Sequence, residues 1–269
     1  MVVLVTGGSS GIGLATVKRL AARDHRVFTA SRRPTRTPLP QGVTPVVFDV
    51  AAPDAVGALV AEVVDAAGTI DVLVNNAGAG GVQPLEDTTD EDAHRLLEVN
   101  VFGPMRLARA VIPVMRAQGG GRIINVSSMN DSLPAPFGGW YSASKAALTS
   151  LSYVLRAELR AHDIHVTVVA PGFFLTDMAS ELSATPIPED SAHAEALRRL
   201  REQDEARLST ADDPDDVARA IEACIDNPEP PARLVVGLDA AGFESLIQSS
   251  SAEDLAGMLV DFVSQLTSD

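Results

Sequence analysis

The chain has 269 residues, 46% of them hydrophobic, and a formal net charge of −15 at pH 7. This length suits one domain with a large core, and the acidic charge argues against a nucleic-acid partner, whose phosphates it would repel. The single cysteine, Cys224, excludes an internal disulfide and any cysteine-cluster metal site, and the five histidines show no metal-ligand spacing. No apolar run approaches the ~20 residues of a membrane span. We therefore expect a cytoplasmic protein with no metal and no membrane contact.

Strand-like and helical segments alternate along the chain. Apolar, β-branched runs predict strands at 2–5, 26–30, 44–48, 71–75, 121–127, 164–169 and 233–236. Helical periodicity predicts helices at about 12–22, 53–67, 91–98 continuing through 101–117, 141–161, 214–226 and 251–266. This alternation predicts an α/β fold in which helices cover both faces of a doubly wound parallel sheet, with residues 1–269 as a single domain. Ligands in such sheets bind beyond the carboxyl ends of the strands.

The first predicted strand runs directly into a glycine-rich turn, Thr6 to Gly13 (TGGSSGIG), and then into a helix. Glycines let the backbone approach a pyrophosphate, and a helix N-terminus offers free N–H groups and positive potential. The G-x-x-x-G-x-G spacing, with no Gly-Lys-Ser/Thr after it, disfavours a nucleotide triphosphatase loop. We favour dinucleotide binding over an ordinary glycine turn. The residues expected at the cofactor are Gly7, Ser9, Ser10, Gly11, Ile12 and Gly13.

The segment after the second predicted strand bears on cofactor choice. An NAD enzyme usually places a carboxylate there for the ribose hydroxyls, but this chain has Ser31, Arg32 and Arg33. A guanidinium can hold a 2′-phosphate through two parallel hydrogen bonds, and a serine does not repel it. We therefore favour NADP over NAD, with solvated loop arginines as the alternative. Residues 1–150 carry 13 acidic and 13 basic side chains and residues 151–269 carry 23 and 8, so the neutral part is the one expected to hold the anionic cofactor. The acidic part is interpreted as a solvated face rather than a docking surface.

A tyrosine and a lysine lie four residues apart in Tyr141-Ser-Ala-Ser-Lys145, and each is one of only two residues of its type in the chain. On a helix, positions i and i+4 share one face. A phenol with a pKa near ~10 is a poor acid or base at neutral pH, and a fixed cation beside it favours the phenolate. The pair is a candidate proton-transfer device, with a plain surface helix as the alternative.

The order and spacing of these motifs resemble the short-chain dehydrogenase/reductase family. The resemblance covers about residues 1–180 and is carried by TGGSSGIG, Asn75-Asn76-Ala77-Gly78, Asn100, Ser128, Tyr141-x-x-x-Lys145, Pro171-Gly172 and Thr176. Within the family, the chain looks similar to 17β-hydroxysteroid and retinol dehydrogenase-like reductases. The resemblance implies a three-layer Rossmann-type fold and homodimers or homotetramers paired through the helices at 101–117 and 141–161. The leucines of the second helix, at 148, 151, 155 and 159, provide a core face and an interface edge.

The resemblance also implies roles for individual residues. Tyr141 would be the general acid or base, Lys145 would lower its pKa and bind the nicotinamide ribose, and Ser128 would hold the substrate oxygen. Ser127 is the alternative to Ser128, and Asn100 would support a water that links the lysine to solvent. The further residues expected to border the cofactor are Asp49, Val50, Asn76, Ala77, Gly78, Pro171, Gly172, Phe174 and Thr176.

We thus expect an NADP(H)-dependent oxidoreductase that interconverts a ketone or aldehyde and its alcohol. Apolar residues between Ser128 and Tyr141 and on the loop after the sixth strand favour an apolar substrate, although core packing explains each one equally well. They are Met129, Leu133, Pro134, Phe137, Trp140, Phe173, Phe174 and Met178. Residues 177–212, rich in Ala, Ser, Pro and charge, suit a mobile lid. The alternatives are epimerase, dehydratase or lyase chemistry with the nucleotide staying bound, and an NADP-sensing regulatory protein.

Overall fold

A computed structural model describes residues 1–33, 38–176, 186–208 and 210–267. Within these ranges one parallel sheet has seven strands in the order β3-β2-β1-β4-β5-β6-β7. The strands are β1 (Val2–Thr6), β2 (Arg26–Ser31), β3 (Val43–Val47), β4 (Val72–Asn75), β5 (Gly121–Val126), β6 (Ile164–Pro171) and β7 (Arg233–Val236). Each predicted strand is confirmed to within two residues at either end. The strand order reverses direction on either side of β1, which is where a doubly wound sheet binds its ligand.

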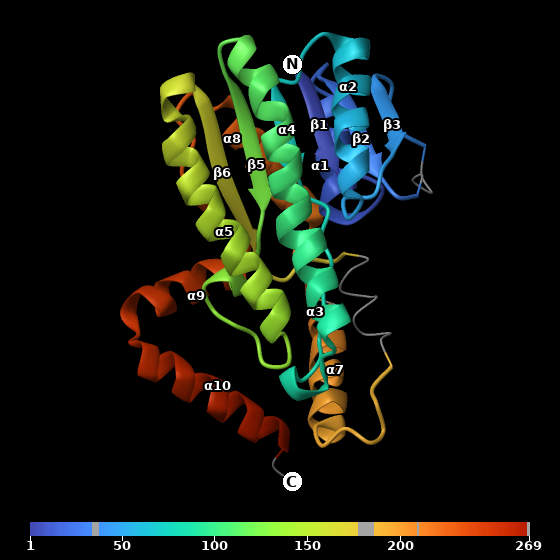
Figure 1. Ribbon diagram of the computed structural model, residues 1–269. Coiled ribbons are helices and arrows are strands. Elements are labelled where there is room, and N and C mark those ends of the chain that lie inside the picture. The colour runs from blue at the N-terminus through green and yellow to red at the C-terminus, as the bar shows by residue number, and fades with distance from the viewer. Residues whose placement is uncertain (34–37, 177–185, 209, 268–269) are drawn as a thin grey trace.

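Helices cover both faces of the sheet (Figure 1). Helices α1 (Gly11–Ala21) and α8 (Pro214–Asp226) lie on one face, and α2 (Val56–Ala67), α4 (Gly103–Ala117) and α5 (Gly139–Leu159) lie on the other. Because successive side chains of a strand point to opposite faces, β1 contributes to two cores. Leu4 packs in the core under α2, α4 and α5, whereas Val3 and Val5 pack in the core under α1 and α8. The predicted three-layer α/β architecture is therefore confirmed.

The predicted helix at 91–98 continues into the helix at 101–117 through a π-helical turn. Thr89 caps α3 (Asp90–Leu97) by accepting a hydrogen bond from the Asp92 N–H, and the π-helix η3 (Glu98–Phe102) joins α3 to α4. A π-turn inserts extra backbone into a helix and often marks a functional position. Asn100 lies in the middle of this turn.

Three helices lie beyond the carboxyl ends of the strands: α7 (Ala194–Leu208), α9 (Leu238–Ser249) and α10 (Ala252–Thr267) (Figure 1). Within the predicted lid region 177–212, residues 194–208 form a helix, and the lid itself stays a prediction. Glu195 of this helix pairs with Arg198 and Arg199 across one turn, which supports a helix with few apolar residues. The lid residues 177–185 and 209 lie outside the described residues.

Short 3₁₀ turns complete the connections. They are η1 (Pro53–Ala55), η2 (Leu85–Asp87), η4 (Met129–Asp131) and η5 (Arg160–His162). Helix α10 confirms the predicted helix at 251–266, whereas α9 was not predicted. None of the helices within the described residues combines the length and the apolar character that crossing a membrane requires.

Candidate active site

The glycine turn between β1 and α1 forms a cradle that side chains would fill. Gly7 and Gly11 have φ of +69° and +51°, a left-handed conformation that favours glycine. A Cβ on Gly13 would come within 2.2 Å of the Gly7 carbonyl oxygen, so this position cannot carry a side chain without a shift of backbone. Ser10 is the N-cap of α1 and makes no side-chain capping bond. The first N–H groups of α1 thus point at a turn whose shape fits a pyrophosphate.

Asn76 fastens this turn to the end of β4. Its side-chain amide donates to the carbonyl oxygens of Thr6 (3.0 Å) and Gly7 (3.2 Å). The Thr6 hydroxyl in turn accepts from the backbone N–H groups of Asn76 (3.1 Å) and Ala77 (3.0 Å). Asn76 therefore shapes the cradle, and the backbone of Ala77 and Gly78 continues from it along the same edge.

The segment after β6 also reaches the cradle. Pro171 is the last residue of β6, and the Gly172 N–H donates to the Val236 carbonyl oxygen on β7 at 2.9 Å. A Cβ on Gly11 would lie 3.3 Å from the Thr176 side chain, so Thr176 borders the glycine turn, and its predicted contact with the cofactor stays a prediction. Phe174 was also expected at the cofactor, and its side chain is only 4% exposed and packs in the core under α1 and α8. An aromatic residue after a buried strand completes that core here, and nothing in the sequence distinguishes this role from a pocket wall.

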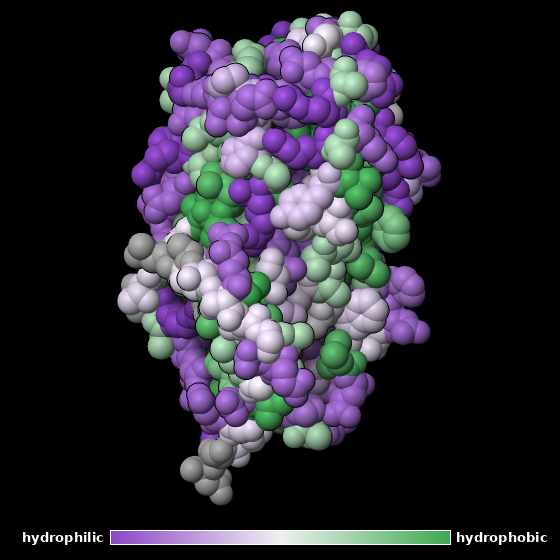
Figure 2. Space-filling model, turned by 90° about the vertical axis from the view of Figure 1, so that its left-hand side faces the viewer, coloured by the Kyte–Doolittle hydropathy of each residue, from purple (hydrophilic) through white to green (hydrophobic). Residues whose placement is uncertain are grey.

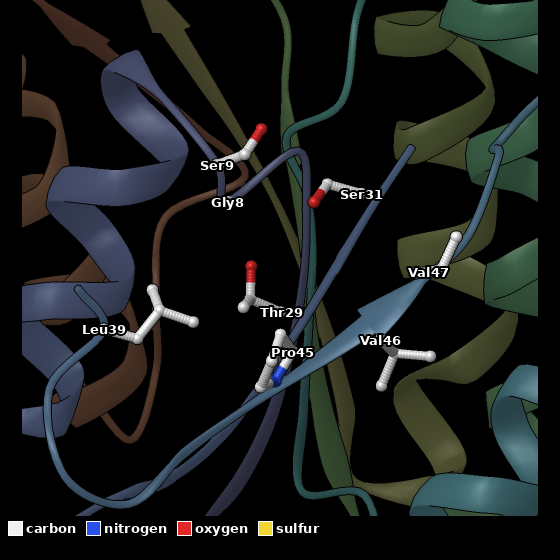
Figure 3. A pocket seen from close by; sticks show the side chains of 8 residues that line it. All are labelled: Gly8, Ser9, Thr29, Ser31, Leu39, Pro45, Val46 and Val47. Carbon is white, nitrogen blue, oxygen red and sulfur yellow. The ribbon is translucent and has the colours of Figure 1, made fainter. Parts of the chain in front are cut away.

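A pocket of about 130 Å³ opens beside the glycine turn, where β2 and β3 end (Figure 3). Its walls include Gly8, Ser9, Ser31 and the apolar side chains of Leu39, Pro45, Val46 and Val47. The Thr29 hydroxyl points toward Gly8 and Ser9 and has no hydrogen-bond partner among the described residues, although it is buried. Arg32 and Arg33 are exposed just past the strand, and the Ser31 hydroxyl donates to the Arg33 carbonyl oxygen at 2.8 Å. The surface of the pocket is mostly apolar, and Arg32 and Arg33 are not among the residues that line it.

Asp49 and Val50, also expected at the cofactor, lie in the loop after β3. The Asp49 carboxylate accepts from the Ala51 N–H at 3.0 Å, which holds the loop in place. Val50 is only 7% exposed and touches the start of α4, where a Cβ on Gly103 would come within 2.5 Å of it. Much of the Val50 side chain therefore belongs to the core.

Tyr141, Lys145 and Ser128 converge at the carboxyl end of β5. Tyr141 and Lys145 lie one turn apart on α5, with the Lys145 Nζ 5.8 Å from the centre of the tyrosine ring. The Lys145 ammonium donates to the Val126 carbonyl oxygen at 3.0 Å. Ser128, just beyond β5, caps η4 by accepting from the Asn130 N–H, and its hydroxyl lies close enough to the Tyr141 phenol to lower the pKa of that group. The arrangement brings a phenol, an ammonium and a hydroxyl together.

Burial sets the acidity of both titratable groups in this trio. Desolvation raises the pKa of Tyr141 above its ordinary value, the hydrogen bond from Ser128 lowers it, and the Asp131 charge raises it. Desolvation lowers the pKa of Lys145 to about 8, against the raising effect of Asp131. The expectation that Lys145 lowers the pKa of Tyr141 is therefore not met in this state. Desolvation outweighs a cation that lies over the ring rather than against the phenol oxygen.

Ser127 and Ser128 point to different environments, although they are adjacent. The Ser127 hydroxyl is buried, 2.9 Å from the Thr149 hydroxyl and 3.2 Å from the Lys145 carbonyl oxygen. Both contacts of the Ser127 hydroxyl are therefore with residues of α5. The Ser128 hydroxyl instead lies near the Tyr141 phenol, whose pKa it lowers.

Asn100 connects the π-helical turn to the same helix. Its amide accepts from the Ala79 N–H (2.8 Å) and donates to the Ala79 carbonyl oxygen (2.9 Å) and the Ser144 hydroxyl (2.9 Å). Ser144 donates to the Tyr141 carbonyl oxygen at 2.7 Å. Asn100 thus holds the loop after β4 and the first turns of α5, while its predicted link to a water stays a prediction.

The loop from 133 to 140 lies against the start of α7. Phe137 has a φ of +59°, and its ring centre is 5.5 Å from that of His193. His193 is 2.6 Å from a Glu86 carboxylate oxygen, and Ser191 donates to Asp87 at 2.5 Å. Trp140 is exposed at the N-terminal end of α5. These contacts close the described part of the lid region onto η2. Met178, also expected at the substrate, lies outside the described residues.

The sequence did not predict a role for Asp131 or Arg233. The Asp131 side chain is completely buried, and Arg233 donates to it at 2.9 Å. The available signal was an acidic residue in the loop between the serine and the tyrosine. Within the described ranges, no group of three or more His, Cys, Asp or Glu side chains is placed to hold a metal ion.

The glycine cradle lies where the strand order of the parallel sheet reverses, as in dinucleotide-binding α/β proteins. Tyr141, Lys145 and Ser128 add groups that can take part in acid–base chemistry. The short chain dehydrogenase family matches residues 1–187. The chain is 32% identical to the 3-ketodihydrosphingosine reductase of Bacteroides thetaiotaomicron, over 88% of this chain and 87% of that one. It belongs to the short-chain dehydrogenase/reductase family and is an oxidoreductase by that membership.

Solved structures agree with this assignment. A short-chain dehydrogenase from Streptomyces avermitilis matches with a TM-score of 0.78 and 32% identity over 99% of this chain and 94% of that one. One from Burkholderia cenocepacia, in complex with NADP, matches with a TM-score of 0.73 and 28% identity over 96% of both chains. One from Burkholderia phymatum, in complex with NAD, shares the fold at a TM-score of 0.77 and 23% identity, over 92% of this chain and 91% of that one. A nicotinamide cofactor is therefore supported.

Proposed function

We propose that the protein is an NADP(H)-dependent carbonyl reductase or alcohol dehydrogenase that acts on an apolar ketone, aldehyde or corresponding alcohol. The observation that carries this proposal is the convergence of Tyr141, Lys145 and Ser128 at the carboxyl end of β5. The site lies at the carboxyl ends of the strands, as does the glycine cradle between β1 and α1.

In this proposal Tyr141 is the proton donor. The phenol carries its proton at neutral pH and so has one to give to a carbonyl oxygen, although its raised pKa makes it a weaker acid than an exposed tyrosine. Ser128 positions that oxygen through the hydroxyl that lies near the phenol, and Lys145 supplies positive charge when negative charge develops on the tyrosine. A bound nicotinamide supplies or accepts the hydride. The cofactor would be held by the turn from Gly7 to Gly13 and by the Lys145 ammonium.

Catalytic turnover separates this function from the alternatives. The test incubates the protein with NADPH and a panel of apolar ketones and aldehydes and follows the loss of nicotinamide absorbance. Net NADPH consumption with formation of the alcohol supports the proposal. Substrate conversion without net NADPH consumption would indicate epimerase, dehydratase or lyase chemistry, and tight NADPH binding without conversion would indicate a sensor.

We propose NADP rather than NAD because Ser31, Arg32 and Arg33 stand where a carboxylate would select NAD. Arg32→Ala should weaken NADPH binding by roughly ten- to a hundredfold, the worth of a charge-assisted hydrogen bond of ~1.5–3 kcal/mol. NADH binding should change little, because NADH has no 2′-phosphate. Fluorescence titration with both nucleotides measures the ratio, and equal losses for both would refute the assignment.

We further propose a cytoplasmic homodimer or homotetramer that pairs through α4 and α5. Leu148 and Leu159 of α5 are buried in the core, but Leu151, Tyr153 and Val154 are 42%, 43% and 54% exposed. Figure 2 views the molecule from the side on which α5 and α9 lie and shows several hydrophobic groups on that face, with hydrophilic side chains between them. Exposed apolar groups of this kind mark contact surfaces.

Val154→Asp should therefore convert the oligomer into a monomer, because a charge would be buried at the interface. Light scattering at micromolar concentration measures the mass. Val260→Asp is the matched control, since Val260 is an exposed valine on α10 (64%) and should leave the assembly intact. A parent protein that is already monomeric would contradict the prediction, and a monomer from Val260→Asp alone would place the interface on α10.

A further inference from the structure

A buried carboxylate lies next to the tyrosine, lysine and serine, and the catalytic scheme above does not use it. Asp131 closes η4, three residues after Ser128, and none of its side chain is exposed. A buried carboxylate is costly unless it is paired and hydrogen-bonded. Asp131 accepts hydrogen bonds from the hydroxyls of Thr149 (2.7 Å) and Ser132 (2.7 Å) and from the Arg233 guanidinium (2.9 Å). The molecule therefore holds a fixed negative charge at this position.

The hydrogen bonds of Asp131 lead back to the catalytic helix. Thr149 lies one turn after Lys145 on α5 and donates its only hydroxyl proton to Asp131. The Thr149 oxygen is then left to accept from Ser127, 2.9 Å away, and the Ser127 hydroxyl is itself 3.2 Å from the Lys145 carbonyl oxygen. On the other side, Arg233 of β7 also pairs with Glu244 of α9. Asp131 is thus the junction between α5, η4 and the C-terminal part of the fold.

The buried Lys145 ammonium requires a nearby negative charge to stay protonated. Lys145 is only 4% exposed, and its hydrogen bond to protein goes to a neutral acceptor, the Val126 carbonyl oxygen. An ammonium buried among neutral groups tends to lose its proton. The Asp131 charge raises the pKa of both Lys145 and Tyr141. It also raises the pKa of the half-exposed Tyr153 further along α5, which Arg233 and Glu244 influence too.

We propose that Asp131 is a positioning residue of the catalytic centre, whose carboxylate, held by Thr149 and Arg233, is the fixed counter-charge of the Lys145 ammonium. The inference rests on the proposed function, since it assigns Asp131 to the support of the catalytic pair. It adds a residue that acts through Lys145 and touches neither the substrate nor the cofactor.

The chain allows a direct test because Lys18 and Lys145 are its only lysines. Lysine labelled with ¹³C at Cε gives two resonances, and Lys18→Arg assigns them. In the parent protein the Lys145 signal should titrate with a pKa of about 8. Asp131→Asn removes the charge and keeps the shape, so the Lys145 pKa should fall by about half to one pH unit, the effect of one charge at short range in a partly screened site. The Lys18 resonance is the internal reference.

Two further variants make the result specific. Glu244→Gln removes a carboxylate from the outer end of the network and should leave the Lys145 titration unchanged. If Asp131→Asn does not fold because Arg233 is left unpaired, Asp131→Asn combined with Arg233→Gln removes both charges and should still lower the Lys145 pKa. An unchanged Lys145 titration in a folded variant without Asp131 would overturn the inference.

The pH dependence of carbonyl reduction provides a second test of the Asp131 charge. The Asp131 charge also raises the pKa of Tyr141, so without that charge the phenol should lose its proton at lower pH. Carbonyl reduction needs the proton on Tyr141. The pH at which the reduction rate falls on the alkaline side of its pH profile should therefore decrease by about half to one pH unit in Asp131→Asn. A purely structural role would lower the rate at every pH without changing the pH of that fall. The lysine titration needs no turnover, so a protein inactive on all carbonyls would refute the proposed function separately.

Discussion

Replacing Tyr141 with phenylalanine should lower turnover by ~10² to 10⁴, the usual worth of a positioned acid or base. The change removes one oxygen and leaves the ring that packs beside the Lys145 ammonium. The fold and the affinity for NADPH should therefore persist, because the glycine cradle is untouched. Steady-state kinetics give the loss of turnover, and nucleotide titration gives the affinity.

The chain provides a matched control on the same helix. Tyr153, the only other tyrosine, lies further along α5 and is 43% exposed. Tyr153→Phe should leave turnover within about twofold of the parent, because a solvated phenol away from the site takes no part in proton transfer. Similar turnover in Tyr141→Phe and the parent would show that the assigned mechanism is wrong.

The second large effect is expected at Gly13. A methyl group there would meet the Gly7 carbonyl oxygen at 2.2 Å and the Asn76 side-chain nitrogen at 2.4 Å. Because overpacking against backbone costs ~1–3 kcal/mol, Gly13→Ala should lower the melting temperature by about 2–4 °C per kcal/mol. The displaced turn should also weaken NADPH and NADH binding alike, in contrast to Arg32→Ala.

Gly57→Ala is the control for this substitution. Gly57 lies in α2, and a Cβ at this position meets nothing within 4 Å. Alanine in an exposed helix replaces the poorer helix former, so this variant should be as stable as the parent or more stable. Thermal unfolding and nucleotide titration of both variants make the comparison. Unchanged nucleotide binding in Gly13→Ala would mean that the cofactor does not use this turn.

The fold was predictable because its signals are local and repeated. The buried strands β1 and β4 are short runs of mostly apolar residues, as expected for a parallel sheet covered on both faces. Strand β6 is equally buried, but it carries His165 and Thr167 among its apolar residues. Helix α7 was missed because its apolar positions are few. It is stabilised by charged pairs within the helix and by contacts of its N-terminal end with η2, which periodicity does not detect.

The residue types of the site were predictable, but their partners were not. Motif spacing placed Tyr141, Lys145 and Ser128 together, and the structure brings them to one strand end. The core packing of the Phe174 side chain was not predictable, because an aromatic side chain after a buried strand suits a core and a pocket wall equally well. Asp131 was missed because its partners Thr149 and Arg233 lie 18 and 102 residues away in the chain. No local pattern records such a contact.

The strand order also determines how the sheet can grow during translation. From β4 onward, each new strand is added to the edge left by the previous strand, in the order in which the ribosome delivers them. Strand β6, buried along its whole length, must wait for β7, which begins at Arg233. At synthesis rates of ~5–20 residues per second, that open edge persists for roughly 3 to 12 seconds. Aggregation of nascent chains through this edge is therefore a specific hazard of the fold, and chaperones that shield β6 would improve the yield of active protein.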